Sequence, residues 1–170
     1  LNFPGAKEIG AEFNSLSKTY GFAGARLGFC LGNSEYVSAL SRLKSNTDYG
    51  VFLPVQRAGI AALQSGEALV RQTAQAYEQR RDVLIEAFGS AGWPIDKPKA
   101  TMFVWARIPA AFGSDDIGFC AALRQCTGVI VTPGSAFGEG GRGYVRMALV
   151  QDEARIREAA ARYGQSMQAV

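Results

Sequence analysis

Short apolar segments alternate with amphipathic helical segments along the whole chain, and glycine or proline separates most of them. The apolar runs predict strands at residues 27–31, 101–108, 128–132 and 144–150, and at 9–17 a strand that runs into a polar turn. Apolar side chains at three- and four-residue spacing predict helices at residues 34–44, 54–63, 67–88, 114–125 and 152–167. Because alternating strands and helices are typical of helices packed on sheets, we predict an α/β fold with open sheets.

The long periodic segment at residues 67–88 predicts a helix that connects two domains. Its charged middle, residues 78–82, alternates in sign as a solvated helix face does. Ser65 and Gly66 interrupt the chain just before it. We therefore expect one domain at residues 1–65 and a second, which includes the connecting helix, at residues 66–170.

Composition argues against nucleic-acid and membrane partners. The 18 Lys and Arg residues exceed the 15 Asp and Glu residues by only three, without a basic tail or an acidic arm. The longest stretch without a charge, residues 125–138, has 14 residues and contains Pro133 and three glycines. A helix that crosses a bilayer needs about 20 predominantly apolar residues, so we expect no membrane span.

The absence of histidine and the spacing of the cysteines exclude several kinds of catalytic and metal site. The chain has no histidine, so a Ser-His-Asp triad, a Cys-His pair and the common zinc sites are excluded, and we expect no metal site. Its three cysteines, Cys30, Cys120 and Cys126, lie in mostly apolar sequence without CxxC spacing. We expect them to be buried and reduced, as in a cytoplasmic protein.

One glycine-containing loop, residues 15–28, combines an amine with groups that bind phosphate. Lys18 supplies a primary amine, which can form a Schiff base with an aldehyde. Ser15 and Ser17 supply hydroxyls, and Arg26 supplies a guanidinium that can bind phosphate through two parallel hydrogen bonds. Pyridoxal 5′-phosphate requires an amine beside such a phosphate site. On spacing alone, a solvated lysine and an arginine in a structural ion pair remain open alternatives.

The same loop resembles the pyridoxal-phosphate attachment signature of class I and II aminotransferases. Its sequence, Ser-Leu-Ser-Lys-Thr-Tyr-Gly-Phe-Ala-Gly-Ala-Arg-Leu-Gly, matches that signature at every restricted position. The resemblance continues at residues 48–56, 101–105, 131–138 and 143–149. It implies the second half of pyridoxal-phosphate fold type I, with the end of the large cofactor domain at residues 1–65 and the small carboxyl-terminal domain at residues 66–170.

The resemblance also implies roles for individual residues. Lys18 is expected to hold the cofactor covalently and, once an amino acid has displaced it, to act as the catalytic base. Ser15 and Arg26 are expected to bind the cofactor phosphate, and the nearby hydroxyl of Ser17 completes the cofactor-binding set. Arg146 is expected to bind the α-carboxylate of the substrate, although sequence alone favours a solvent-facing arginine at a strand edge.

The reaction implied is the transfer of an amino group between an amino acid and a 2-oxo acid. Residues 48–56 and 144–149 look like those of the alanine and LL-diaminopimelate branch, with glutamate or 2-oxoglutarate as the second substrate. Residues 48–56 contain no arginine where aspartate-specific relatives carry one, which disfavours a dicarboxylate preference. Relatives are usually cytoplasmic homodimers, so both properties are expected here.

Only the second half of such an enzyme is represented, and we expect residues 1–170 alone to have little or no transaminase activity. The absent half should carry the aspartate that pairs with the pyridinium nitrogen of the cofactor. Two alternatives remain: a pyridoxal-phosphate-dependent β-eliminating lyase of the same fold, and a non-catalytic dimerisation or regulatory domain derived from it.

Overall fold

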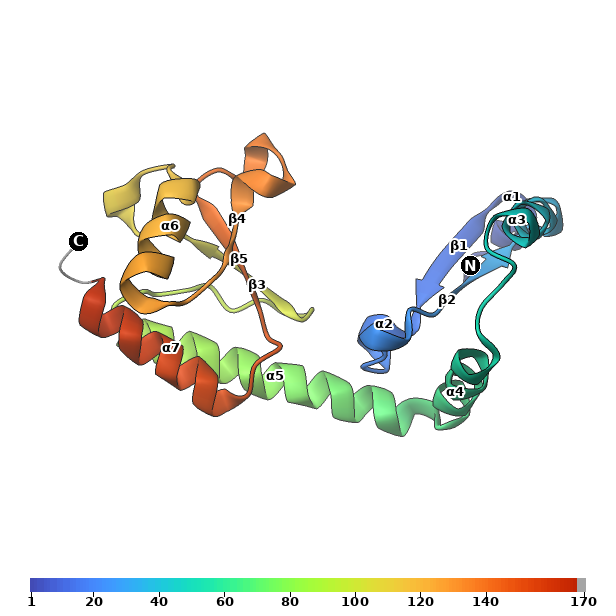
Figure 1. The fold of residues 1–170 in the computed structure, drawn as a ribbon, viewed down its shortest axis with the longest axis horizontal. Helices are drawn as coiled ribbons and strands as arrows, with labels where there is room; N and C mark the ends of the chain where they lie inside the picture. The colour runs from blue at the N-terminus through green and yellow to red at the C-terminus, as the bar shows by residue number, and fades with distance from the viewer. Residues whose placement is uncertain (168–170) are drawn as a thin grey trace. The chain divides into compact units, whose positions relative to one another are not determined.

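The computed structural model describes residues 1–167 and confirms the mixed α/β class (Figure 1). The chain divides into two compact units, one at Leu1–Ala74 and one from Gln75 onward. The boundary lies inside α5 (Gly66–Ser90), the 25-residue helix that corresponds to the predicted connecting segment. Both sheets are antiparallel.

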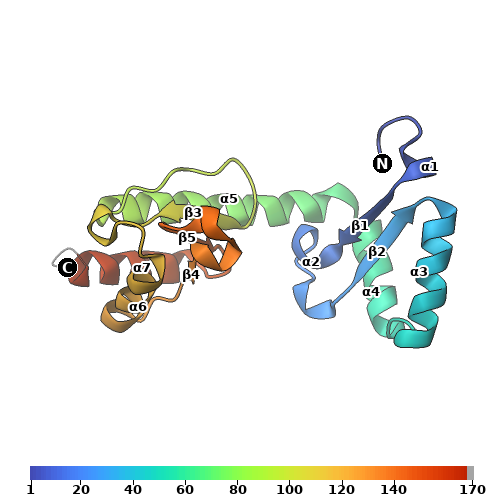
Figure 2. The same ribbon diagram turned by 90° about the horizontal axis from the view of Figure 1, so that it is seen from above.

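The first unit is built around a two-stranded sheet of β1 (Ala11–Ser15) and β2 (Gly28–Gly32) (Figure 2). The strands pair from Ala11 opposite Gly32 to Ser15 opposite Gly28. The short segments of this unit are α1 (Ala6–Ile9), α2 (Leu16–Thr19) and η1 (Ala23–Ala25), and its longer helices are α3 (Ser34–Thr47) and α4 (Leu53–Gln64). Asn33 caps α3 by accepting hydrogen bonds from the backbone N–H groups of Glu35 and Tyr36, as its sequence position predicts.

The second unit contains a three-stranded sheet in the order β3-β5-β4 and the larger core. Its elements after α5 are β3 (Phe103–Arg107), η2 (Ala110–Phe112), α6 (Asp116–Thr127), β4 (Thr132–Pro133), η3 (Gly134–Phe137), η4 (Glu139–Gly141), β5 (Tyr144–Ala148) and α7 (Glu153–Ser166). Alternate residues of the strands, Val104 and Ala106 on β3 and Val145 and Met147 on β5, are buried. Since side chains alternate across a strand, the residues between them lie on the opposite face of the sheet.

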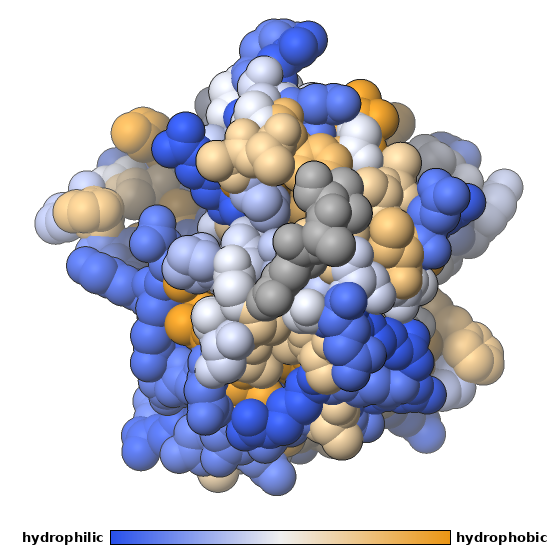
Figure 3. Space-filling view, turned by 90° about the vertical axis from the view of Figure 1, so that its left-hand side faces the viewer, coloured by the Kyte–Doolittle hydropathy of each residue, from blue (hydrophilic) through white to orange (hydrophobic). Residues whose placement is uncertain are grey.

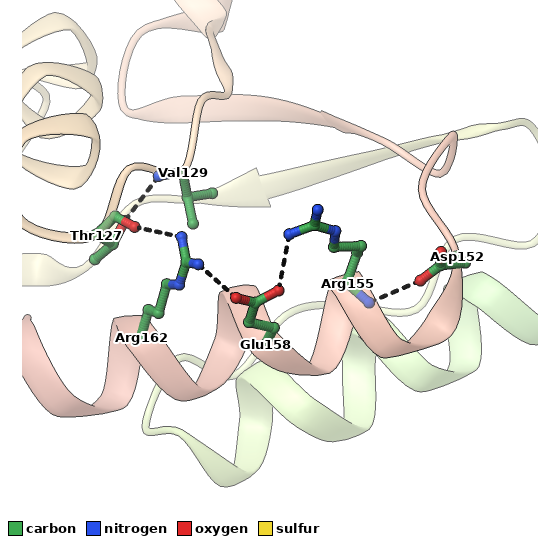
Figure 4. A network of polar contacts seen from close by, with 6 residues as sticks. All are labelled: Thr127, Val129, Asp152, Arg155, Glu158 and Arg162. Atoms are coloured by element: carbon green, nitrogen blue, oxygen red, sulfur yellow. Dashed lines mark hydrogen bonds and ion pairs between the residues drawn. The ribbon is translucent and has the colours of Figure 1, made fainter.

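Polar contacts join the end of α6 to α7 (Figure 4). The Thr127 hydroxyl accepts from the Val129 N–H at 3.0 Å, and Arg162 donates to the Thr127 carbonyl at 3.4 Å. Glu158 pairs with both Arg155 and Arg162 on α7. On the side drawn in Figure 3, hydrophilic residues cover most of this unit and apolar residues form small separate patches.

Several predicted details are wrong. Strand 128–132 is reduced to Thr132–Pro133, because Gly128 adopts the left-handed conformation that ends α6 and Ile130 is 78% exposed. The strand expected at residue 9 begins at Ala11, since Ile9 closes α1.

Burial also departs from expectation in the charged middle of α5 and at the cysteines. The charged middle of α5 is not entirely solvated, because Arg81 is only 7% exposed. Its guanidinium pairs with Glu78 and Asp82 and donates to the Pro98 carbonyl. All three cysteines are free, but none is buried: Cys30 and Cys120 are partly exposed, and Cys126 is exposed. Across residues 1–167, no helix is both long and apolar enough to span a bilayer.

Candidate active site

The loop predicted to hold the cofactor closes the end of the β1–β2 pair. Ser15, the last residue of β1, caps the short helix α2 by accepting a hydrogen bond from the Ser17 N–H at 3.1 Å. The Leu16 N–H donates to the Leu27 carbonyl at 3.1 Å, which joins the two ends of the loop. The turn between β1 and β2 is therefore closed, and it carries both Lys18 and Arg26.

Apolar packing against α4 holds this turn in place. Leu16 is 2% exposed and Ser17 is 8% exposed, so the first turn of α2 is buried while Lys18 is exposed. Leu16 and Leu27 lie against Gly59 of α4, where an added Cβ would come within 2.2 Å of a Leu27 methyl group. The glycine thus allows α4 to approach closely, and the turn is held in place while its charged side chains remain accessible.

The two charged groups of the turn are free to bind a ligand. Arg26 adopts a left-handed backbone conformation, with φ at 54°, and donates from one guanidinium nitrogen to the Ala23 carbonyl at 3.1 Å. Within the described residues, neither Lys18 nor Arg26 forms an ion pair. An amine, a guanidinium and the Ser15 hydroxyl on one turn match the donors that a phosphorylated aldehyde needs. The residues present fit pyridoxal phosphate.

Arg146 lies in the other unit, on the middle strand of its sheet. It is opposite Trp105 of β3 and opposite Thr132 of β4. The expectation of an edge strand is therefore wrong, because β5 is flanked on both sides. Arg146 is half-buried and, in the part of the chain that the structure describes, forms no ion pair.

Two aromatic rings cover the Arg146 guanidinium. Its central carbon lies 4.2 Å from the Phe103 ring centre and 4.4 Å from that of Phe137. Trp105 packs edge-on to Phe137 at 5.7 Å and stacks on Tyr144 at 5.8 Å. Ring faces attract the cation but do not neutralise it, and they leave the hydrogen-bonding edge of the guanidinium for a planar anion. A carboxylate is the anion that suits this edge.

The sequence patterns did not predict that these rings lie beside Arg146. Phe103 and Trp105 alternate along β3 and so lie on the same face of the sheet. A prediction of the register between β3 and β5 would have placed both residues next to Arg146. No such signal exists for Phe137, because it belongs to the irregular turn η3 and reaches Arg146 only through tertiary structure.

Comparisons with known proteins identify relatives along nearly the whole chain. A family model described as aminotransferase class I and II matches residues 5–162. The chain is 45% identical over 159 residues to LL-diaminopimelate aminotransferase of Moorella thermoacetica, with 94% of the chain covered. It is 47% identical over 162 residues to the glutamate-pyruvate aminotransferase AlaC of Escherichia coli, again with 94% of the chain covered.

The solved structures agree with the sequence relatives. An aminotransferase structure from Staphylococcus aureus superimposes with a TM-score of 0.84 at 33% identity, and covers 95% of this chain. The chain spans 40% of the Moorella protein, 39% of the Escherichia protein and 43% of the Staphylococcus structure. The match therefore covers nearly all of this chain but less than half of each relative.

Proposed function

Because the chain belongs to the class I and II aminotransferase family, we propose that it forms the carboxyl-terminal half of a pyridoxal-phosphate-dependent aminotransferase. The observation that carries this proposal is the turn between β1 and β2, which presents Lys18 and Arg26 without carboxylate partners among the described residues. Residues 1–65 would complete the large domain of the enzyme, and residues 66–170 would form its small domain.

Each residue of the turn has a distinct task in this proposal. Arg26 and the Ser15 hydroxyl bind the phosphate group, and Ser17 contributes a further polar group in the buried first turn of α2. Pyridoxal phosphate, when bound, supplies a reactive carbonyl carbon and a conjugated ring that withdraws electrons. Lys18 holds that carbonyl carbon through its Nζ atom. Once free, the same amine accepts the proton from the Cα atom of the amino acid.

Arg146 orients the amino acid. Its guanidinium edge binds the α-carboxylate through two parallel hydrogen bonds, while Phe103 and Phe137 exclude water from its faces. Fixing the carboxylate fixes the direction of the Cα–H bond, which removal of the Cα proton requires.

Alanine or LL-diaminopimelate is the proposed amino acid, with glutamate and 2-oxoglutarate as the second pair. The names of the two relatives support this choice, and so does the absence of arginine from residues 48–56. We expect the complete enzyme to be a cytoplasmic homodimer, and the 170-residue chain alone to have little or no transaminase activity.

The test is to express the complete gene, including the sequence upstream of Leu1, and to follow each product of the reaction. Amino transfer predicts a new 2-oxo acid from alanine or LL-diaminopimelate, glutamate formed from 2-oxoglutarate, no ammonia, and loss of both products in Lys18→Ala. Release of ammonia and a 2-oxo acid from an amino acid that carries a leaving group on Cβ, such as a thiol, would instead identify the β-eliminating lyase. A melting temperature that pyridoxal phosphate leaves unchanged, together with no turnover, would identify the non-catalytic domain. Robust turnover by residues 1–170 alone would overturn the proposal that the missing half is needed.

A further inference from the structure

A buried carboxylate outside the catalytic set lies at the start of α6. Asp116 is 3% exposed, and its Oδ2 atom accepts a hydrogen bond from the Ser135 N–H at 2.8 Å. Within residues 1–167 it forms no ion pair, so the Ser135 side chain, backbone N–H donors and the amino end of α6 compensate its charge. The bond spans 19 residues of sequence and joins α6 to the turn η3.

The turn that Asp116 holds carries one of the two rings on Arg146. Phe137 is the last residue of η3, two positions after Ser135. A second contact fixes the same turn, because the backbones of Gly134 and Gly141 pack so closely that a Cβ on Gly134 would lie 2.1 Å from the Gly141 carbonyl oxygen. Phe137 is 51% exposed, so apolar burial contributes little to its position.

From this arrangement, and on the basis of the proposed function, we propose that Asp116 is a positioning residue of the substrate-carboxylate site. By accepting the Ser135 N–H it keeps η3 where Phe137 covers the Arg146 guanidinium. Without this bond the turn would shift, the guanidinium would gain water on one face, and its edge would no longer be presented in a single orientation. Asp116 thus acts on substrate binding through Phe137 and touches neither substrate nor cofactor.

The chain offers a matched control one residue earlier. Asp115 caps the same helix by accepting from the Gly118 N–H at 2.9 Å, but makes no hydrogen bond to η3. Asp115→Ala therefore weakens the amino end of α6 and leaves the Ser135 bond intact. Asp116→Asn keeps an acceptor oxygen and loses the charge.

Kinetics of the complete enzyme separate positioning from general destabilisation. Asp116→Ala is expected to raise KM for the amino acid and the 2-oxo acid about tenfold, while kcat changes about twofold or less. Asp116→Asn should recover part of this loss, and Asp115→Ala should leave KM unchanged. If Asp116 acts through Phe137, the double variant Asp116→Ala/Phe137→Ala should have the same KM as Phe137→Ala alone. Independent, additive effects of the two substitutions would overturn the proposal, as would an unchanged KM in Asp116→Ala.

A structural readout keeps this test separate from that of the proposed function. Trp105 packs against Phe137, so displacement of η3 should change the tryptophan fluorescence of the substrate-free protein in Asp116→Ala and not in Asp115→Ala. If the wild-type enzyme transfers no amino group, the proposed function fails, and the fluorescence comparison still decides whether Asp116 holds Phe137. Equal spectra for Asp116→Ala and wild type would show that it does not.

Discussion

In the second unit, the proposed binding of substrate depends on the Arg146 guanidinium. It is half-buried between two rings, and no carboxylate among the described residues neutralises it. Other buried arginines in proteins are commonly paired, and Arg81 in this chain has two carboxylate partners. An unpaired guanidinium between two rings is reasonable if an external anion completes the site.

Replacing Arg146 should weaken substrate binding in the complete enzyme. Arg146→Lys keeps the charge but cannot form two parallel hydrogen bonds to a carboxylate, so KM for the amino acid should rise about 10- to 100-fold. Arg142→Gln is the matched control, because Arg142 is exposed and pairs with Glu139 on the surface. Steady-state kinetics with alanine test the difference. Equal KM values for Arg146→Lys and Arg142→Gln would contradict the role of Arg146.

The β1–β2 pair determines the position of the turn that carries Lys18 and Arg26. The last pair joins Ser15 to Gly28, and a Cβ on Gly28 would lie 2.7 Å from the Asn14 carbonyl oxygen. Gly28→Ala would therefore push the strands apart next to the proposed phosphate site. Gly24, in the same turn, has no atom within 4 Å of such a Cβ.

We expect Gly28→Ala to reduce pyridoxal-phosphate affinity and to cost about 1–3 kcal/mol of stability, as overpacking does. Gly24→Ala should change stability by less than about 0.5 kcal/mol, as a substitution in open space does. Thermal unfolding with and without pyridoxal phosphate measures both effects. Similar behaviour of the two variants would show that strand spacing does not control the turn.

The ion pairs of α5 predict a dependence of stability on pH. Hydrogen bonds from Arg81 and then Lys97 lower the pKa of Asp82 from 3.8 to about 2. The unfolded chain therefore takes up this proton at a higher pH than the folded chain, so the stabilisation is complete above pH 3.8 and disappears as the pH falls through about 2.

Asp82→Asn should lower the melting temperature at neutral pH and make it less sensitive to pH between those two pKa values. Glu67→Gln is the control, since the pair of Glu67 with Arg71 is exposed on the same helix. Melting curves recorded at successive pH values test this expectation. A slope in Asp82→Asn as steep as in the wild type would contradict it.

Sequence patterns predicted the elements that local signals define and missed those that depend on tertiary contacts. The apolar runs of β3 and β5 and the apolar spacing in α3 and α6 are local signals, and the structure confirms the elements that they predict. Arg81 is bonded to the distant Pro98 carbonyl, and the turn that carries Phe137 is bonded to the distant Asp116. A motif can identify the lysine turn, whereas only three-dimensional structure shows which rings cover Arg146.

For the whole molecule, the first unit is notable for its uncovered apolar side chains. Phe3, Phe13, Tyr49 and Phe52 are between 73% and 92% exposed, and its sheet has only two strands. Such small sheets are at most marginally stable without further packing, and large exposed apolar side chains mark contact surfaces. Since relatives are more than twice as long, we attribute the exposure to a surface that the rest of the enzyme covers.

The isolated chain should therefore associate with itself at high concentration. Phe13 is 74% exposed on β1, and Phe13→Lys should reduce this association by placing a charge on the strand. Sedimentation velocity over a range of concentrations measures the effect. A monomer at every concentration would show that the exposed apolar side chains are not a contact surface.

The proposed function requires Lys18 to be the residue that captures pyridoxal phosphate. The most direct measurement is to mix the complete enzyme with the cofactor, reduce the mixture with borohydride and map the modified lysine by peptide mass analysis. We expect modification at Lys18 at a stoichiometric cofactor concentration, and none at the exposed Lys7 of the same unit. Modification spread over surface lysines, with Lys18 no more reactive than Lys7, would contradict it.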